Sequence, residues 1–437
     1  MTGGADLLAR LARAGQEPIV HHLRSVSGER RARLLAQLAS IDLELVADLR
    51  AGRRIAPPPS GEIEPVPYAA FATRARERRP RERGEEELRA DRVAFVLLAG
   101  GQASRLRWDG PKGAYPIGPA TRRTLFQILA EKLLRAGRRH GAAPRLAVTT
   151  SPGTNAAIRE HFAAAGNHGI PADRVRFAVQ ASVPALDEQG HLLLEGPDTI
   201  FASPDGHGGA ATALETSGIL QEWEASSVTT VCTFQVDNPA LQVVDPDFIG
   251  RLLLGSSPVA TKVVLKTDPA ERVGVVARSA GRPALLEYSE ISKERAEARD
   301  PDGQLTFRLG SIAVHAFRLD FLRAGLRGRL PFHKALKEIP CVDAEGRVSR
   351  PKGLKFERFL FDLFPLAPSV AVVEALRERE YAPLKNAEGA DSPEAVRAAL
   401  DSEYRRWYRE AGKRPPPGPR LEISPLVAEG PEDLLDS

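Results

Sequence analysis

The chain has 437 residues, of which 42% are apolar and 27% are charged, and it carries a formal net charge of +4. That is enough apolar material for a sizeable core, in two or three domains or in one large α/β domain with attachments. A membrane span and a signal peptide are not expected, because there is no run of about 18 apolar residues and no basic-then-apolar leader. Cys232 and Cys341 are the only cysteines, which excludes a disulfide framework and favours the cytoplasm.

The densest run of charges extends from Arg74 to Arg92 and is basic first and acidic second. A nucleic-acid surface would need aromatic side chains between the basic ones to stack on bases, and this run has none. The pattern therefore predicts a solvated helix or linker, and we expect no nucleic-acid partner.

The chain changes character along its length. Residues 5–50 have leucines at helical spacing, and closely spaced prolines follow at 57–67. From Arg92 onward, short apolar runs alternate with helical patterns, which is typical of βαβ units and a parallel sheet. The segment Val273 to Tyr288 has a central Ala-Gly-Arg-Pro turn and predicts a hairpin, so the sheet is expected to be mixed. We expect a helical region with a linker at 1–60, an α/β domain at 61–390, and a small C-terminal domain at 391–437 that opens with a helix.

The sharpest local motif is VAFVLLAGGQASRLRWDGPKGAYPIG, residues 93–118. A buried strand ends at Gly100-Gly101, and a polar loop with Arg105 and Lys112 follows. Glycines let backbone N–H groups approach phosphate oxygens, and Arg and Lys supply charge. The motif predicts a triphosphate cradle at the carboxyl end of the strand, where open α/β sheets bind ligands. Neither the dinucleotide fingerprint GxGxxG nor the P-loop GxxxxGK[ST] is present.

Three other stretches have the residue types of a ligand site. VCTFQVDNP predicts a strand that ends at Asp237, either a Mg²⁺ ligand or a turn residue. SPDGHGG, residues 203–209, is a second glycine-rich loop. EYSEI offers the carboxylates of Glu287 and Glu290 for sugar hydroxyls, and Glu290 is the better candidate for a local turn contact.

These blocks also carry a family resemblance. LAGGQASRL followed by PKGAY resembles the first signature of the UDP-sugar pyrophosphorylases, and the nearest branch is that of the UDP-N-acetylhexosamine pyrophosphorylases. TLFQI, SPDGHGG, VDNPALQVVDPDFIG, EYSEIS, GLKFERFLFD, PLKNAEG and EISPLV have counterparts in the same order. The resemblance implies a Rossmann-like nucleotidyltransferase domain at 61–390, with a mixed, mostly parallel sheet, between the helical N-terminal part and the small C-terminal domain.

The resemblance also implies the chemistry. A sugar 1-phosphate would attack the α-phosphate of UTP in line, with Mg²⁺ as cofactor, to give a UDP-sugar and pyrophosphate. The nucleophile is already an anion, so positioning and charge neutralisation are needed rather than a general base. The implied roles are catalysis by Arg105, Lys112 and Lys355; nucleotide binding by Leu98, Gly100, Gly101, Gln180 and Gly206; sugar binding by His207, Gly274, Glu287 and Ser311; and metal binding by Asp237.

Several departures leave the sugar open. The N-acetylhexosamine branch has Asn where this chain has His207 and Ser311, and Gly where it has Arg107. N-acetylglucosamine 1-phosphate is the favoured substrate, and UDP-glucose or broad UDP-sugar synthesis is the alternative. A UDP-sugar glycosyltransferase is disfavoured because Asp-x-Asp is absent at Asp237. A non-catalytic nucleotide-binding relative also remains open.

Overall fold

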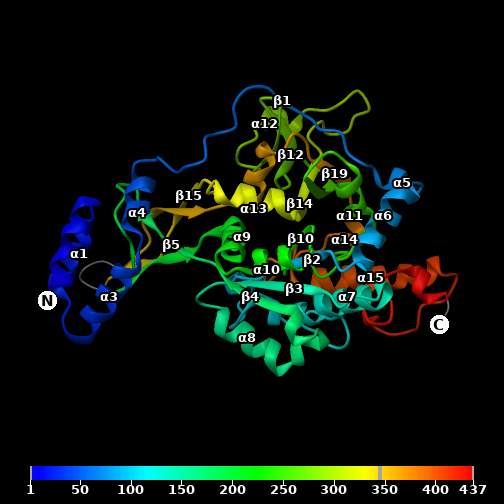
Figure 1. Ribbon diagram of the computed structural model, residues 1–437, viewed down its shortest axis with the longest axis horizontal. Helices are drawn as coiled ribbons and strands as arrows, with labels where there is room; N and C mark the ends of the chain where they lie inside the picture. The colour runs from blue at the N-terminus through cyan, green and yellow to red at the C-terminus, as the bar shows by residue number, and fades with distance from the viewer. Residues whose placement is uncertain (1, 343–346, 436–437) are drawn as a thin grey trace. The chain divides into compact units, whose positions relative to one another are not determined.

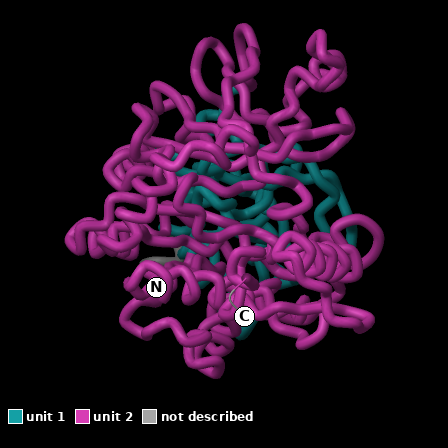
Figure 2. Tube along the Cα trace, turned by 90° about the vertical axis from the view of Figure 1, so that its right-hand side faces the viewer, with its two compact units in different colours: residues 1–57, 180–209, 329–360 teal, residues 58–179, 210–328, 361–437 magenta. Residues whose placement is uncertain are grey.

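The computed structural model describes residues 2–342 and 347–435, and its contacts divide the chain into two compact units (Figure 2). Unit 1 comprises residues 1–57, 180–209 and 329–360, and unit 2 comprises residues 58–179, 210–328 and 361–437. Each unit is therefore assembled from three separate stretches of chain. The division into 1–60, 61–390 and 391–437 follows sequence pattern rather than compactness, and it stays a prediction.

Unit 1 begins with the helices expected from the leucine spacing. They are α1 (Thr2–Arg13), α2 (Glu17–Ser25), α3 (Gly28–Ser40) and α4 (Leu43–Arg50). Leu11, Leu34 and Leu38 are fully buried, which confirms the apolar face. These leucines share one core with Val183 and Phe356 of the strands in the same unit. The strands are β5 (Ser182–Pro184), β6 (Leu186–Asp187), β7 (Leu194–Gly196), β8 (Thr199–Ile200), β9 (Ala202–Pro204), β15 (His333–Glu338), β16 (Cys341–Val342), β17 (Val348–Ser349) and β18 (Lys352–Glu357).

Unit 2 is built on a ten-stranded mixed sheet (Figure 1). Its strands are β1 (Ile63–Glu64), β2 (Val93–Leu98), β3 (Arg145–Thr150), β4 (Val175–Val179), β10 (Thr230–Gln235), β11 (Val259–Leu265), β12 (Val275–Ser279), β13 (Arg282–Leu286), β14 (Leu309–Arg318) and β19 (Ala371–Glu374). Strands β10, β2, β3 and β4 run parallel in that spatial order, and β14 joins β10 antiparallel. The predicted α/β class with a mixed sheet is confirmed.

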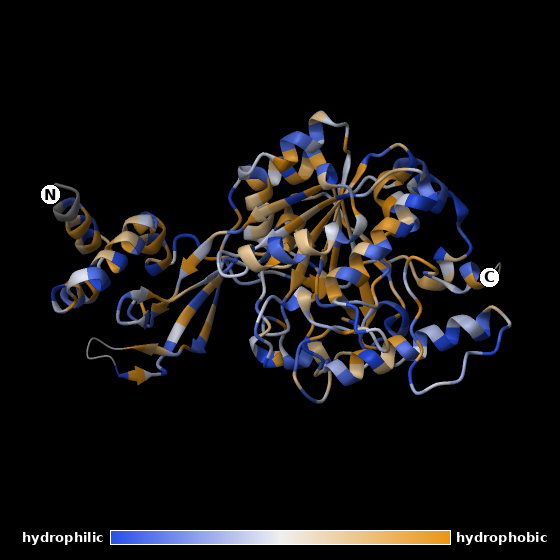
Figure 3. Cartoon of the chain, turned by 90° about the horizontal axis from the view of Figure 1, so that it is seen from below, coloured by the Kyte–Doolittle hydropathy of each residue, from blue (hydrophilic) through white to orange (hydrophobic). Residues whose placement is uncertain are grey.

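Helices pack around this sheet, and its strands are more hydrophobic than the helices (Figure 3). The helices are α5 (Phe71–Arg74), α6 (Arg78–Arg89), α7 (Leu125–His140), α8 (Asn155–Ala164), α10 (Ile219–Ala225), α11 (Pro246–Leu254), α12 (Lys293–Glu297), α13 (Leu319–Arg327), α14 (Arg377–Glu380) and α15 (Pro393–Glu410); α9 (Gly206–Thr216) starts in unit 1 and ends in unit 2. Short 3₁₀ turns are η1 (Ser104–Leu106), η2 (Lys112–Ala114), η3 (Gly166–Gly169), η4 (Ala172–Arg174), η5 (Leu360–Leu366) and η6 (Pro431–Leu434). Among the described residues, no helix is both long and apolar enough to span a membrane.

Two local predictions are confirmed and a third holds in part. Most of the charge run forms the helix α6, where Glu85 pairs with both Arg81 and Arg89. The run is not fully solvated, because Glu87 is buried and Arg74, in α5, forms buried ion pairs with Asp245 and Asp247. The hairpin is β12–β13, and its turn residues Ala280 and Gly281 have φ of 50° and 75°, as a two-residue type I′ turn requires. The C-terminal helix is α15, where Ser392 caps the first turn by accepting from the Ala395 N–H at 3.3 Å.

Candidate active site

The order of the parallel strands marks a place for a ligand. Along the chain, β2, β3 and β4 follow one another in one direction across the sheet, whereas β10 lies on the other side of β2. Loops that leave neighbouring strands on opposite sides open a crevice at the carboxyl ends of those strands. Leu98, the last residue of β2, is paired in register with Gln235, the last residue of β10. The glycine turn that follows β2 and the Asp237 loop that follows β10 therefore leave the sheet at neighbouring positions.

Lys112 and Asp237 meet at this edge of unit 2. The Lys112 Nζ lies 3.4 Å from Asp237 Oδ2 and donates to the Leu384 carbonyl at 3.2 Å. Leu384 in turn donates its N–H to the Asp237 carbonyl at 2.8 Å. Asp237 is only 8% exposed, so its carboxylate is held in place by the neighbouring cation and by a fixed backbone. Gly113 sets the position of Lys112, because a Cβ at residue 113 would lie 2.2 Å from the Phe126 ring.

The glycine turn itself is open. A Cβ at Gly101 would meet no atom within 4 Å, so neither packing nor a left-handed backbone calls for glycine there. Arg105 is exposed in η1, and within 2–342 and 347–435 no hydrogen bond or ion pair engages its guanidinium. Arg107, which ends this turn, has the left-handed φ of 52°. This conformation suits the glycine that the related branch has, and it costs a non-glycine residue about 1–2 kcal/mol.

The predicted sugar residues of unit 2 also lie together. Ser311 of β14 donates its N–H to the Gly274 carbonyl at 2.8 Å. A Cβ on Gly274 would lie 3.6 Å from Glu287 Oε1, so the three positions form one cluster. Glu290 accepts from the Glu287 N–H at 2.8 Å, which confirms that it makes a local turn contact.

Ser311 sits in an irregular stretch of β14. Its hydroxyl accepts from the Ala313 N–H at 3.2 Å, and Ala313 has a φ of 55°. The register with β11 shifts between Lys262 and Val263, opposite this point. Bulges of this kind redirect side chains and are frequent beside active sites.

In unit 1, Gln180 and Gly206 lie together. The buried Gln180 Nε2 donates to the Gly206 carbonyl at 3.3 Å and lies 3.5 Å from Asp205 Oδ1. Gly206 has a φ of 81°, and a Cβ there would be 2.4 Å from the Arg358 carbonyl, so both backbone and packing require glycine. Arg358 also pairs with the fully buried Asp205 through its side chain. Desolvation nevertheless leaves the pKa of Asp205 raised above its usual value, because it outweighs the Arg358 charge.

His207 is held as a neutral ring. The Leu360 N–H donates to its Nδ1 at 3.0 Å, and the ring lies 5.1 Å from that of Phe359. Burial, together with His333 nearby, lowers the pKa of His207 to about 4. An Nδ1 that accepts a hydrogen bond leaves the proton on Nε2.

Lys355 lies in β18, opposite Ala335 of β15. Its Nζ is 5.0 Å from the centre of the Phe201 ring, a cation–π contact. Burial and the neighbouring Lys337 lower the pKa of Lys355. Glu357 and Glu195 lie close enough to oppose this shift. A partly desolvated lysine is suited to bind a phosphate.

Two lysines of unit 2 were missed by sequence reasoning. Lys385, in the block PLKNAEG, lies close enough to Asp237 for their charges to interact: burial lowers its pKa, but Tyr381, Asp237 and Asp391 raise it above the usual value. Lys132 of α7 donates to the carbonyls of Pro239 and Leu241, two and four residues after Asp237. No spacing motif links either lysine to Asp237, so the sequence holds no signal for these contacts beyond the family block around Lys385.

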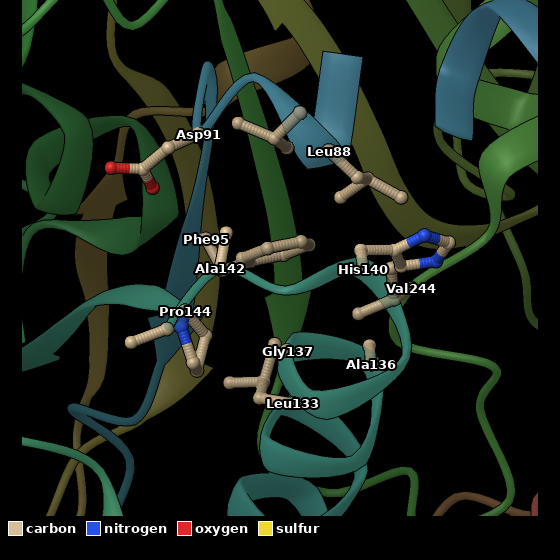
Figure 4. Close-up of a pocket in the computed structure, with 12 residues that line it drawn as sticks. Leu88, Asp91, Phe95, Leu133, Ala136, Gly137, His140, Ala142, Pro144 and Val244 are labelled. Carbon is tan, nitrogen blue, oxygen red and sulfur yellow. The ribbon is translucent and has the colours of Figure 1, made fainter. Parts of the chain in front are cut away.

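A small hollow in unit 2 lies away from this chemistry (Figure 4). It is lined by Leu88, Asp91, Phe95, Leu133, His140, Pro144 and their neighbours. Asp91 precedes β2 and Pro144 precedes β3, so the hollow is at the amino ends of these strands, whereas Gly101 and Asp237 follow the carboxyl ends.

The fold agrees with comparisons to known proteins. Residues 53–389 match the UTP–glucose-1-phosphate uridylyltransferase family. The chain is 38% identical to the human UDP-N-acetylhexosamine pyrophosphorylase-like protein 1, over 99% of this chain and 94% of that protein. It is 33% identical to the Saccharomyces cerevisiae UDP-N-acetylglucosamine pyrophosphorylase, over 96% of this chain and 94% of that protein. The crystal structure of the Trypanosoma brucei uridine diphosphate N-acetylglucosamine pyrophosphorylase with an inhibitor superposes with a TM-score of 0.81 at 28% identity, over 98% and 93% of the two chains.

The chain therefore belongs to the UDP-sugar pyrophosphorylase family and is a uridylyltransferase. Within the family it falls in the branch of the UDP-N-acetylglucosamine and UDP-N-acetylhexosamine pyrophosphorylases. The resemblance inferred from the motifs is confirmed.

Proposed function

We propose that the enzyme couples UTP to N-acetylglucosamine 1-phosphate and releases pyrophosphate, with Mg²⁺ held in part by Asp237. The observation that carries this proposal is the pairing of Lys112 with Asp237, 3.4 Å apart, next to Gly101, whose carbonyl accepts from the Lys112 N–H. A cation and a carboxylate at one strand edge can receive a phosphate and a metal respectively. The two free, buried cysteines agree with a place in the cytoplasm.

The residues near Asp237 suit a Mg²⁺ ion that is held by one protein carboxylate and by the phosphate oxygens of the substrate. No group of three metal-binding side chains occurs among residues 2–342 and 347–435, and a Mg²⁺ site in a nucleotide enzyme uses one or two carboxylates plus phosphate oxygens. Asp237, at the carboxyl end of β10, would be that carboxylate. When bound, the ion would neutralise phosphate charge and orient the α-phosphate.

The protein residues would do the rest by placing charges. Lys112 and the exposed Arg105 would bind the phosphates of UTP, and the backbone of Gly100 and Gly101 would lie against them. Lys385, beside Asp237, adds a third cation in unit 2, and Lys355 in unit 1 is the fourth candidate. Gln180 would read the uracil edge with its amide. These groups lower the cost of bringing an anionic nucleophile to an anionic α-phosphorus.

For the sugar, Glu287 would accept from hydroxyls, with Gly274 and Ser311 beside it and His207 in unit 1. The identities of 38% and 33% to N-acetylhexosamine and N-acetylglucosamine enzymes support the N-acetylated sugar. His207 and Ser311, where the branch has asparagines, support glucose 1-phosphate as the second candidate.

The test is the rate of pyrophosphate release with UTP and a set of sugar 1-phosphates at equal concentration. We expect N-acetylglucosamine 1-phosphate to give the highest kcat/KM and Asp237→Ala to abolish the Mg²⁺-dependent rate. A higher kcat/KM with glucose 1-phosphate would replace the first candidate by the second, and UTP binding without pyrophosphate release would refute both.

A further inference from the structure

A lysine of α7 holds the loop that carries Asp237. Lys132 points its Nζ at this loop and donates to the Pro239 carbonyl at 2.8 Å and to the Leu241 carbonyl at 2.6 Å. One cationic side chain thus binds two peptide groups within four residues of Asp237. The contact spans 107 residues of sequence to Pro239, so it joins a rigid helix to the loop rather than closing a local turn.

A second anchor acts on the same loop from another part of unit 2. The Asn238 amide donates to the Glu380 carbonyl at 2.7 Å and accepts from the Ala382 N–H at 3.1 Å. The Glu380 carboxylate is itself bound by the fully buried Lys262 at 2.6 Å. Asn238 therefore attaches the loop to a buried ionic network.

An ammonium group is an expensive way to bind two carbonyls. Burial lowers the pKa of Lys132 to about 8, against the opposing charges of Glu429 and Glu380. An apolar side chain of similar length would fill the same volume without this desolvation cost. The lysine places a charge near the buried Glu429 and adds directed hydrogen bonds to the loop backbone.

We infer that Lys132 and Asn238 are positioning residues, which fix the backbone after β10 so that the Asp237 carboxylate faces Lys112. This inference rests on the proposed role of Asp237 in the reaction. Neither side chain touches the reacting atoms; each acts through the loop.

The experiment compares Lys132→Met, which keeps length and removes the donors, with Lys132→Arg and with the control Arg138→Met at an exposed position of the same helix. Hydrogen–deuterium exchange of peptides covering 236–243 is measured in the metal-free enzyme. We expect this loop to exchange at least about tenfold faster in Lys132→Met and at the normal rate in the control.

The kinetic readout uses UTP, Mg²⁺ and N-acetylglucosamine 1-phosphate. We expect Lys132→Met to lower kcat by about ten- to a hundredfold and to raise the Mg²⁺ concentration for half-maximal rate, with KM for the sugar phosphate within about twofold. Lys132→Arg should recover most of the loss, because it restores the donors. If Lys132→Met does not fold, Asn238→Ser is expected to give the same combination in a folded protein.

Loop exchange and Mg²⁺ dependence equal to those of Arg138→Met would overturn the inference. A uniform loss of stability without faster loop exchange, or without recovery by arginine, would overturn it too. The proposed role of Asp237 fails separately, if Asp237→Ala keeps its normal Mg²⁺ dependence.

Discussion

The Lys112 Nζ and Asp237 Oδ2 lie 3.4 Å apart. Both residues also hydrogen-bond to the backbone of Leu384: Lys112 donates to its carbonyl, and its N–H donates to the Asp237 carbonyl. The ammonium and the carboxylate neutralise each other before any ligand is present. In the proposed reaction a phosphate would pair with the ammonium and Mg²⁺ with the carboxylate, so each group would exchange one counter-charge for another.

Lys112→Ala is expected to lower kcat by about 10²–10³-fold, the range found when one preorganised donor to a developing charge is removed. The fold should persist, because the Leu384 N–H still holds the Asp237 carbonyl. Pyrophosphate release and thermal unfolding measure the two effects. Turnover near the normal rate would remove Lys112 from the mechanism.

Ser311→Asn is expected to shift specificity toward the N-acetylated sugar. The Ser311 hydroxyl already accepts from the Ala313 N–H, whereas the longer amide offers both a donor and an acceptor to the substrate. One added hydrogen bond is worth about 0.5–1.5 kcal/mol, so kcat/KM for N-acetylglucosamine 1-phosphate over glucose 1-phosphate should rise by up to about tenfold. An unchanged ratio in a variant with normal unfolding would exclude a sugar contact at this position.

His207 is expected to make the protein sensitive to acid. Its pKa is about 4 in the folded state, compared with about 6.5 in an unfolded chain. The unfolded state therefore binds the proton first, and stability falls as the pH drops from about 6.5 toward 4, by on the order of 3 kcal/mol in all.

The control for His207 is His207→Asn, whose side-chain oxygen can accept from the Leu360 N–H but does not titrate. Denaturant unfolding is followed between pH 7 and pH 4 for both proteins. The natural protein should lose more stability than the variant over this range, and parallel curves would contradict the assignment.

Lys262→Met is expected to lower the free energy of unfolding of unit 2 by about 3–5 kcal/mol. The Lys262 Nζ lies 2.9 Å from Asp245 Oδ2 and 2.6 Å from Glu380 Oε2, and all three residues are buried. Arg74 still pairs with Asp245 in the variant, but the buried Glu380 carboxylate loses its direct cation beside a second carboxylate. The matched control is Lys293→Met, whose side chain is 88% exposed, and denaturant unfolding within about 1 kcal/mol of this control would contradict the prediction.

Much of unit 2 could be predicted from sequence because its signals are local. The apolar run of β2, the glycines after it and the turn of the β12–β13 hairpin each lie within a few residues. The contacts that complete the site are not local: Lys132 reaches Pro239 and Asn238 reaches Glu380 across 107 and 142 residues. Hydrophobic periodicity and motif spacing do not predict contacts between residues so far apart in the sequence.

The same reason explains what was missed in unit 1. Gly206 was named through the family resemblance, but the packing that requires glycine there, with the Arg358 carbonyl 2.4 Å from where a Cβ would lie, is not visible in the sequence. The helices of residues 5–50 were predicted from their leucines, but their partners β6 and β18 lie far along the chain. Local sequence patterns predict which residues form one helix or strand, but they do not show that the N-terminal helices pack on β6 and β18.

The three-stretch construction of unit 1 has a consequence during synthesis. Ile55 forms a parallel bridge with Phe332, so the N-terminal helices emerge from the ribosome long before their sheet partners exist. At about 5–20 residues per second, the roughly 280 intervening residues take on the order of 15–60 s to be translated. The strands of residues 180–209 supply part of the native cover for α1 to α4 earlier in that interval, but β15 and β18 complete it only at the end. Until then part of the apolar face of these helices stays open to solvent.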